Sequence, residues 1–479
     1  MHEFHKQQKP IERLAKFTSG LFSNGHWKCT EWNKAQKAVL IYSQKCEVLV
    51  ITSMMLYDIY EQLFFQEHQL PSTVLIQSSN NMHIEVRNTI FLALAVFGYV
   101  ALWRFAGQNG TFGMMREWSS QNRLPGTGET YATKFTRWRG LDEFIRSLLT
   151  IFWPMVNGTQ PGSSLMCFYF AGQGIAAWIL TALEGQRHSN KGNWRVISFI
   201  TAYGLLFQGL GIGIIGPIFL LFAPLGDRRT SSVFVHYRTD VDAIIPATIG
   251  GIIVPTVLMS LHEPTVISLE QKVDLIRLWQ FFPLLFRLGQ RVWTGFISVW
   301  LSSYGDELAE KDPQVQRRTF RRVYTFGLCC AAVPHVGTIA ISLMSLFFPS
   351  FFAGNLANEF HPCNLFVPVS PLSGAQARTV GEGAHWFLQW DMILMFCTYL
   401  VWAYFADIKV KYPDSGVVSP QLFLRLLGWS LLFGPMGAVL LAMWERDDVV
   451  FDAEEQKIES RKGMAAKIAS FSKTEYKGD

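Results

Sequence analysis

Residues Val196–Phe222 read VISFITAYGLLFQGLGIGIIGPIFLLF, an apolar run without a single Asp, Glu, Lys or Arg. A helix that crosses a bilayer needs about 20 mainly apolar residues, so this run is long enough to span a membrane. Similar runs recur along the chain, separated by short loops in which Lys and Arg are concentrated. Because lipid offers no hydrogen-bond partners to an open backbone, this pattern predicts an all-α fold, a polytopic transmembrane helical bundle.

We expect about nine spans, eight of them strong and one weak. The weak span is Ala38–Tyr60, which Lys45 and Glu47 interrupt. Leu141–Val156 is short and carries charged residues, so we predict that it lies at the membrane interface. The strong candidates are Thr89–Phe105, Ser164–Leu183, Val196–Phe222, Val241–Leu261, Leu275–Leu301, Val323–Phe348, Trp386–Phe405 and Leu422–Trp444.

Loop charge divides the chain into three predicted parts. Residues 1–37 are rich in Lys and form a cytoplasmic N-terminal segment, since positive loops stay on the cytoplasmic side. Residues 38–444 form the transmembrane helical domain, and residues 445–479 form a polar C-terminal tail. The first residues contain no early apolar run, so we expect an uncleaved signal anchor and a multi-pass location in the endoplasmic reticulum membrane.

Composition and absent motifs exclude several function classes. Only 16% of the 479 residues are charged, and the net charge of +5 lies in loop clusters rather than on one face of a domain, so no nucleic acid partner is expected. We find no Walker A loop, CxxCH, HExxH or DDxxD-like box. These absences argue against nucleotide, haem, zinc and metal–diphosphate chemistry, and we expect no cofactor, no bound metal and no nucleotide partner.

Two carboxyl groups in apolar runs require an explanation, because a charge at the bilayer centre costs on the order of 3 kcal/mol. Glu184 ends an apolar helix, with Arg187 and Asn190 at i+3 and i+6, so the three should lie near one another. They would form either an interfacial salt bridge or a site. Asp391 lies early in HWFLQWDMILMF beside Trp390, either at the headgroup level or in an aromatic pocket. Such a pocket favours the neutral carboxyl, which could then donate a proton.

Weaker candidates occupy helix ends and positions next to proline or glycine. Glu263 follows an apolar run and belongs to a loop or to a site. His335 follows Pro334 inside a span, where a satisfied kink residue is the simpler explanation. Gln208 precedes a glycine-rich run that predicts close helix packing and a break at Pro217.

Aromatic residues are abundant, with 38 Phe, 16 Trp and 14 Tyr. They would face lipid and the membrane interfaces, or line a cavity whose π faces stabilise carbocations. Composition does not separate these two possibilities.

Four blocks of the sequence resemble fungal integral membrane terpene cyclases of meroterpenoid clusters, of the macrophorin and ascofuranone types. They are LTALEGQRHSNKGNWRVISFITAYGLLFQGLGIGIIGPIFLLF, AIIPATIGGIIVPTVLM, LWQFFPLLF and FLQWDMI, and they lie between Leu180 and Trp402. The region Met1–Asn88 has no counterpart. The resemblance implies a farnesyl chain on a phenolic or quinol-derived head, cyclised after protonation of an alkene or an epoxide. It also implies that Glu184 and Asp391 are the acids of the cavity, with Gln208 nearby.

The leading hypothesis is therefore a metal-independent, membrane-embedded terpene cyclase. Its partners would be the lipid bilayer and a hydrophobic prenylated small molecule. The alternative is a transporter or exporter of a lipophilic metabolite, because discontinuous helices line transport sites. The candidate catalytic residues are Glu184, Asp391 and Glu263, and the candidate substrate-binding residues are Arg187, Asn190, Gln208, Trp390 and His335.

Overall fold

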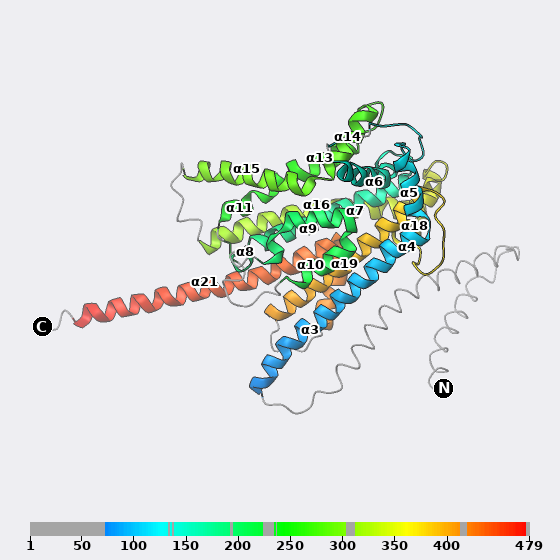
Figure 1. Ribbon diagram of the computed structural model, residues 1–479. Helices are drawn as coiled ribbons and strands as arrows, with labels where there is room; N and C mark the ends of the chain where they lie inside the picture. Colours follow the sequence, from blue (N-terminus) through cyan, green and yellow to red (C-terminus); the bar gives the residue numbers. More distant parts are fainter. Residues whose placement is uncertain are drawn as a thin grey trace, which may run out of the picture. The chain divides into compact units, whose positions relative to one another are not determined.

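The computed structural model describes residues 72–132, 135–136, 138–191, 195–223, 234–235, 237–302, 312–411 and 419–475. The chain divides into two compact units, Met1–Gln69 and Leu70–Asp479. The first unit, which includes the predicted cytoplasmic segment and the weak span Ala38–Tyr60, lies outside the described residues. The described part of the second unit is helical (Figure 1), and its only bridges are isolated ones, Arg123–Thr130 and Arg187–Val235.

Helices follow one another along the described chain, twelve of them with ten or more residues and eleven shorter. They are α3 (Ser72–Gly98), η1 (Tyr99–Arg104), α4 (Phe105–Gln108), α5 (Thr111–Ser120), α6 (Arg139–Val156), α7 (Pro161–Gln186), α8 (His188–Lys191), η2 (Val196–Ser198), α9 (Ile200–Leu210), α10 (Ile212–Leu221), α11 (Arg238–Asp242), α12 (Ile244–Thr248), η4 (Ile249–Ile253), α13 (Val254–Met259), α14 (Leu269–Trp279), α15 (Phe282–Ser302), α16 (Pro313–Phe347), η6 (Pro349–Phe351), α17 (Leu356–Glu359), α18 (Pro362–Phe366), α19 (Val380–Lys411), α20 (Pro420–Phe433) and α21 (Pro435–Glu475).

Five of the described helical stretches are long and apolar enough to cross a membrane. They are Met82–Gln108, Pro161–Gln186, Arg238–Met259, Pro313–Phe347 and Val380–Lys411. The prediction of an all-α polytopic membrane protein is confirmed by these helices. The count of about nine spans stays a prediction.

Several of the strong candidate spans are interrupted. Val196–Phe222 is broken at Gly211 and Leu422–Trp444 at Gly434, where the backbone has φ of 91° and 82°. These angles are accessible to glycine and strained for other residues. The break predicted at Pro217 is wrong: this proline lies inside α10, where it removes one backbone hydrogen bond without turning the chain. Leu275–Leu301 is divided between α14 and α15.

Helices that are distant in the sequence pack side by side. α3, α10 and α19 pack against one another, as do α7, α16 and α21, and α19 also packs against α21 (Figure 1). Glycine allows the closest approach between α7 and α16, because a Cβ on Gly172 would overlap the ring of Pro334. The predicted tail boundary at residue 445 falls inside α21, and Arg446, Asp447 and Phe451 beyond it are buried.

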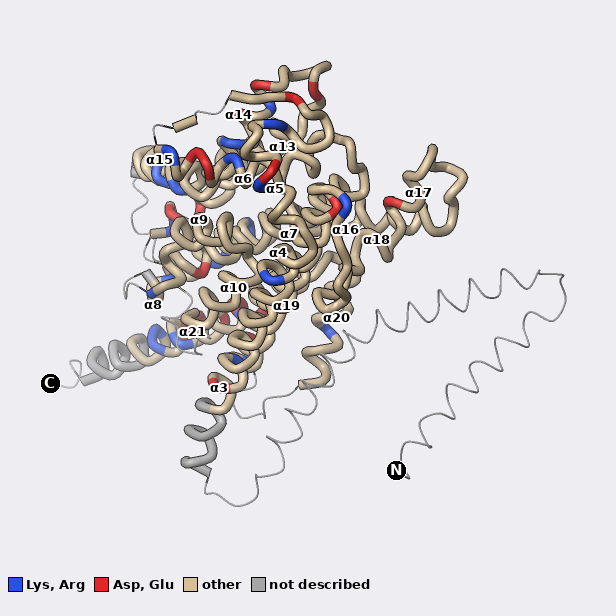
Figure 2. The backbone as a smooth tube through the Cα atoms, turned by 45° about the vertical axis from the view of Figure 1, so that its right-hand side comes forward, with Lys and Arg blue, Asp and Glu red and all other residues tan. Residues whose placement is uncertain are grey.

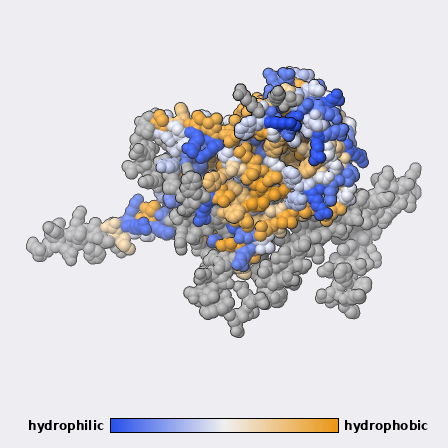
Figure 3. Space-filling view, viewed as in Figure 1, coloured by the Kyte–Doolittle hydropathy of each residue, from blue (hydrophilic) through white to orange (hydrophobic). Residues whose placement is uncertain are grey.

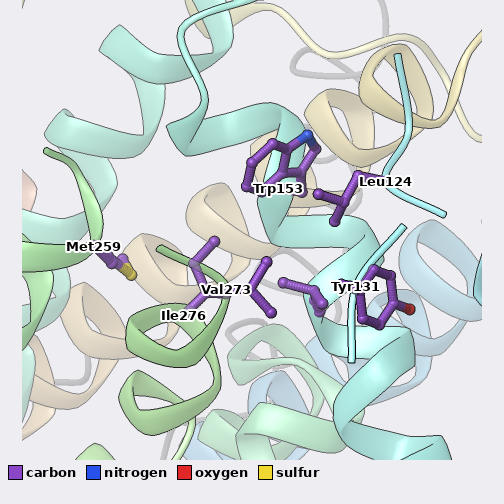
Figure 4. Packing of buried hydrophobic residues seen from close by; sticks show 7 residues of the cluster. Leu124, Tyr131, Trp153, Met259, Val273 and Ile276 are labelled. Carbon is purple, nitrogen blue, oxygen red and sulfur yellow. The ribbon is translucent and has the colours of Figure 1, made fainter. Parts of the chain in front are cut away.

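The predicted interfacial segment Leu141–Val156 forms most of α6, which is amphipathic. One face of α6 packs against the loop before it and against α14. The buried residues of this cluster are drawn in Figure 4: Leu124, Tyr131, Leu149, Trp153, Met259, Val273 and Ile276.

The outer surface of the bundle carries large apolar side chains. Along α15, Leu288, Val292, Phe296 and Val299 are each more than 60% exposed. Figure 3 shows a broad hydrophobic area on one face, bordered by hydrophilic residues. Figure 2 shows charged segments gathered near α5, α6, α14 and α15, with long uncharged stretches elsewhere. Exposed apolar surface of this extent marks contact with a membrane or a partner, and with spanning helices it indicates lipid contact.

Candidate active site

A cavity of about 510 Å³ lies inside the described bundle, between α5, α6, α7, α9, α14, α15 and α19. Its wall is mainly apolar and strongly aromatic. Six of its aromatic side chains come from five different helices: Trp178, Tyr203, Phe207, Trp279, Phe282 and Tyr399. A cavity of this size and lining is suited to a hydrophobic small molecule.

The aromatic rings support one another mostly in edge-to-face pairs. Trp178 lies 5.0 Å from Phe282 and 6.2 Å from Phe207, measured between ring centroids, and Tyr203 lies 5.2 Å from Phe207. Rings packed this way are held in fixed orientations. An aromatic face turned toward the cavity attracts a positive charge, by about 0.5–2 kcal/mol.

Asp391 is the single carboxylate among the described residues that line the cavity. Its side chain is 6% exposed, and its Oδ1 atom accepts a hydrogen bond from the backbone N–H of Gly213 at 2.7 Å. Gly213 belongs to the first turn of α10, whose leading N–H groups have no partner within the helix. The helix break at Gly211 therefore supplies the donor that holds the acid.

Glycine is required at this break for space as well as for backbone conformation. A Cβ on Gly211 would lie 2.9 Å from Oδ1 of Asp391 and 2.9 Å from Cδ1 of Leu102. A Cβ on Gly213 would lie 2.8 Å from Cβ of Leu394. The glycine-rich run thus brings the backbone of α10 against α19, as the prediction of close helix packing required.

Gln208 lies on α9 just before the same break and also lines the cavity. Its Nε2 atom is buried and has no hydrogen-bond partner among the described residues. Two of the predicted site residues, Asp391 and Gln208, are therefore brought to one cavity. The amide of Gln208 is available to hydrogen-bond a polar atom of a ligand.

Two tyrosines in the cavity wall were not predicted as site residues. The hydroxyl of Tyr399 lies 2.7 Å from Oγ1 of Thr181 and 3.3 Å from the hydroxyl of Tyr203, and all three side chains are buried. Asp391, Met395 and Tyr399 follow at i, i+4 and i+8, on one face of α19, and all line the cavity. This spacing was a usable signal, because residues four apart share a helix face.

Glu184, Arg187 and Asn190 lie together, as their spacing predicted, but outside the described lining of the cavity. Arg187 donates to Glu184 at 2.7 Å, and Asn190 donates from Nδ2 to the backbone carbonyl of Glu184 at 2.8 Å. Arg446 of α21 donates to Glu184 at 2.6 Å, and Asp447 accepts from Arg187 at 2.7 Å.

The two carboxylates and two guanidinium groups balance one another. Tyr324 adds a hydroxyl donor to Asp447 at 2.7 Å. Removing one member would leave a buried charge uncompensated, which is costly. The group therefore fastens the end of α7 to α21 and α16.

The other predicted residues are distributed around the bundle, and none of them is among the described residues that line the cavity. Glu263 lies in the loop after α13. His335 on α16 lies with Nε2 3.0 Å from the carbonyl of Leu431, and Trp390 donates from Nε1 to the carbonyl of Val369 at 2.9 Å. Across the part of the chain that the structure describes, no group of three or more His, Cys, Asp or Glu could hold a metal ion.

Fold and site together define a class: a polytopic helical membrane protein that encloses an aromatic cavity with one buried carboxyl at its wall. The CtvD domain profile matches residues 86–451, and the chain belongs to this family. The match leaves out nearly all of Met1–Asn88, the region for which the resemblance offered no counterpart.

Curated relatives of the chain include three fungal terpene cyclases. The chain is 31% identical to terpene cyclase ascI of Acremonium egyptiacum, over 77% of this chain and 93% of the relative. It is 27% identical to terpene cyclase ctvD of Aspergillus terreus, over 74% of this chain and 97% of the relative. It is 28% identical to terpene cyclase penA of Penicillium crustosum, over 74% and 94%. The predicted resemblance to fungal meroterpenoid terpene cyclases is confirmed. No solved structure matches the chain.

Proposed function

We propose that this protein is a terpene cyclase of the endoplasmic reticulum membrane. It would protonate an alkene or a terminal epoxide of a farnesylated aromatic or quinol-derived precursor and cyclise the prenyl chain. One observation carries the proposal: among the described residues of the aromatic cavity, Asp391 is the single acid, buried and anchored by a backbone N–H. The relatives named terpene cyclases support the same reaction type.

The proposed reaction starts with proton transfer from Asp391. Oδ1 is engaged by Gly213, so Oδ2 would carry the proton. The proton forms a bond to the distal alkene carbon or to the epoxide oxygen, and a carbocation forms at the neighbouring tertiary carbon. The next alkene attacks this carbon and closes a ring. Loss of a proton, or attack by a head-group hydroxyl with loss of its proton, ends the reaction and gives an isomer of the precursor.

The surrounding residues would stabilise the charges that develop. The N–H of Gly213 stabilises the carboxylate that remains after proton transfer, and it is in place before the reaction begins. The rings of Trp178, Phe207 and Phe282 would stabilise the carbocation by cation–π attraction. Gln208 would hydrogen-bond a polar atom of the substrate through its free amide group. The apolar wall excludes water, which would otherwise trap the carbocation.

A turnover assay in microsomes tests this proposal. Farnesylated phenols are supplied as the alkene and as the terminal epoxide, in the presence of a chelator and without added metal. We expect a cyclised product of unchanged mass from one of them, and the preferred precursor identifies the group that is protonated. Failure of a well-expressed protein to convert any precursor would contradict the cyclase assignment.

A second candidate function is transport of a lipophilic metabolite. The broken helix pairs α9–α10 and α20–α21 favour it, because discontinuous helices line many transport sites. Uptake of a labelled prenylated phenol into proteoliposomes, without chemical conversion, would support transport instead of cyclisation.

A further inference from the structure

The wall of the cavity is polar at a second place, away from the bond between Asp391 and Gly213. Arg116 and Ser119 of α5 and Ser147 of α6 all line the cavity. Arg116 is the single Lys or Arg in the described lining, and it is exposed, whereas Asp391 is buried. The cavity therefore has a cation where it meets the surface and an acid in its interior.

The guanidinium of Arg116 has no hydrogen-bond, ion-pair or ring partner within the described part of the chain. The other arginines near this end of the bundle, in contrast, have partners. Arg139 pairs with Glu143 at 2.8 Å, Arg146 donates to Asn122 at 2.9 Å and Arg277 pairs with Asp274 at 2.9 Å. Arg116 thus offers its donors to a ligand, and it does so at the cavity.

The two serines complement this cation. The hydroxyl of Ser119 donates to the backbone carbonyl of Arg116 at 3.2 Å, and the hydroxyl of Ser147 donates to that of Glu143 at 3.1 Å. Each hydroxyl proton is used, so the lone pairs of each oxygen remain to accept a hydrogen bond. The guanidinium donates hydrogen bonds and the two hydroxyl oxygens accept them. An acidic O–H group of a ligand matches this arrangement, because its oxygen accepts and its hydrogen is donated.

We propose that Arg116, with Ser119 and Ser147, binds the oxygenated, acidic head group of the substrate at the cavity opening. The ligand class is an amphiphile with a prenyl tail and a phenol, enol or carboxylic acid head. Arginine suits this role, because its planar fork forms strong, directional bonds to anionic oxygen. That the ligand is prenylated rests on the proposed cyclase function.

This placement gives the substrate one direction in the cavity. With its head held at Arg116, the prenyl chain extends along the aromatic wall toward Asp391. The end of the chain that lies farthest from the head would then meet the acid. Head-group binding thus selects the distal alkene or epoxide for protonation, ahead of the alkenes nearer the ring.

The experiment measures binding separately from turnover. The purified protein is placed in phosphatidylcholine nanodiscs, and quenching of tryptophan fluorescence reports binding, since Trp103, Trp178 and Trp279 line the cavity. The probes are a farnesylated phenol and the corresponding farnesylbenzene, which lacks the oxygen that would accept from Arg116. Arg116→Leu, Arg116→Lys and Arg123→Leu are compared with the unchanged protein. Arg123 is the matched control, because it is also exposed but does not line the cavity.

We expect Arg116→Leu to weaken binding of the phenol by about tenfold, as the loss of a charge-assisted hydrogen bond predicts. Binding of the farnesylbenzene should change less than about twofold. The affinity of Arg116→Lys for the phenol should lie between those of Arg116→Leu and the unchanged protein, and Arg123→Leu should match the unchanged protein. Equal loss for both probes, no loss for either, or no binding of either probe by the unchanged protein would overturn the proposal.

Turnover of the same samples separates the two proposals. Selective loss of phenol binding without cyclisation would keep the head-group site and contradict the cyclase. Cyclisation with phenol binding unaffected by Arg116→Leu would keep the cyclase and contradict the head-group site.

Discussion

Asp391 and Gly213 join two helices across the cavity wall, through a 2.7 Å hydrogen bond from the backbone N–H of Gly213 to Oδ1 of Asp391. The donor belongs to the first turn of α10 and the acceptor to the interior of α19. The N-terminus of α10, which carries a partial positive charge, lies against the carboxyl of Asp391. It would therefore stabilise the negative charge that forms if Asp391 loses its proton.

Asp391→Asn separates acidity from structure. The asparagine oxygen can still accept from Gly213, so folding and ligand binding should persist, whereas the acidic proton is lost. We expect turnover to fall by about 10²–10⁴-fold, the usual contribution of a general acid. Single-turnover kinetics in nanodiscs measure this loss. Asp274→Asn, at a largely exposed carboxylate, is the control, and turnover within threefold of normal for Asp391→Asn would show the assignment to be wrong.

Gly211→Ala should disturb both the helix break and the acid. Alanine is strained at φ 91°, and its Cβ would lie 2.9 Å from Oδ1 of Asp391. We expect a loss of stability of about 1–3 kcal/mol and a lower rate of turnover. Thermal unfolding in detergent measures the first effect. Gly428→Ala is the control, since a Cβ there meets nothing within 4 Å, and an equal response of the two variants would contradict the expectation.

Glu184→Gln tests whether this residue is a structural partner or an acid catalyst. Among the described residues, the substitution leaves Asp447 as the one carboxylate that pairs with Arg187 and Arg446. We expect a loss of about 3–5 kcal/mol in stability, as for other broken buried ion pairs, with normal turnover per folded molecule. Normal stability with no turnover would instead make Glu184 a catalytic residue.

A double variant strengthens this test. Combining Glu184→Met with Arg446→Met removes one charge of each sign and leaves Arg187 paired with Asp447. The double variant should recover much of the stability that Glu184→Gln loses, because apolar replacement of a whole pair is tolerated better than removal of one partner. Glu143→Gln, on the exposed face of α6, should have little effect.

Trp178→Leu should change the products rather than prevent protonation. The indole is part of the cavity wall beside Phe207 and Phe282. Loss of its π face removes about 0.5–2 kcal/mol of cation stabilisation, so incompletely cyclised products should increase several-fold. Mass-spectrometric product profiles measure this shift. Trp138→Leu, at an exposed position, is the control and should leave the product profile unchanged. An unchanged profile for Trp178→Leu would contradict the expectation that its ring faces the carbocation.

Asp142, at the start of α6, should make stability depend on pH. It accepts hydrogen bonds from the backbone N–H and the hydroxyl of Thr136, at 2.7 Å and 2.9 Å. Burial raises the pKa of Asp142, but these bonds and the charge of Arg146 bring the pKa below its usual value. The stabilisation is then complete above the unfolded pKa of about 3.9 and is lost as the pH falls through the folded pKa.

Asp142→Asn provides the comparison for that pH dependence. The difference in unfolding temperature between the unchanged protein and Asp142→Asn should be constant above about pH 5 and should shrink on acidification. A difference that grows on acidification would reverse the sign and contradict the lowered pKa of Asp142.

Hydropathy was sufficient to predict the fold class, because each buried span must carry an apolar sequence of fixed minimum length. It was not sufficient to locate the breaks. Pro217 was the expected interruption, yet the chain turns at Gly211, where the positive φ matters more than the missing N–H of a proline. A glycine-rich run contains several candidate breaks, and the contacts of Gly211 with Asp391 and Leu102 come from residues distant in the sequence, which leave no local pattern.

Residues of the cavity lining could be predicted where they were unusual in their surroundings. Asp391 stood out as a charge in an apolar run, and Gln208 as an amide beside glycines, and both line the cavity. Tyr203 did not stand out, because aromatic residues are common throughout the chain. Arg446 and Asp447, the partners of Arg187 and Glu184, were assigned to a polar tail, since pairing across more than 250 residues leaves no local pattern.

The bond between Gly213 and Asp391 links residues 178 positions apart. Translation completes α10 long before α19 exists, and chains fold from the N-terminus as they are made. The carboxylate partner of the glycine-rich break is therefore still missing when α10 has been made. A nascent chain that stops before α19 holds most of the aromatic wall but lacks Asp391, so the described lining of the cavity acquires its carboxyl only late in biosynthesis.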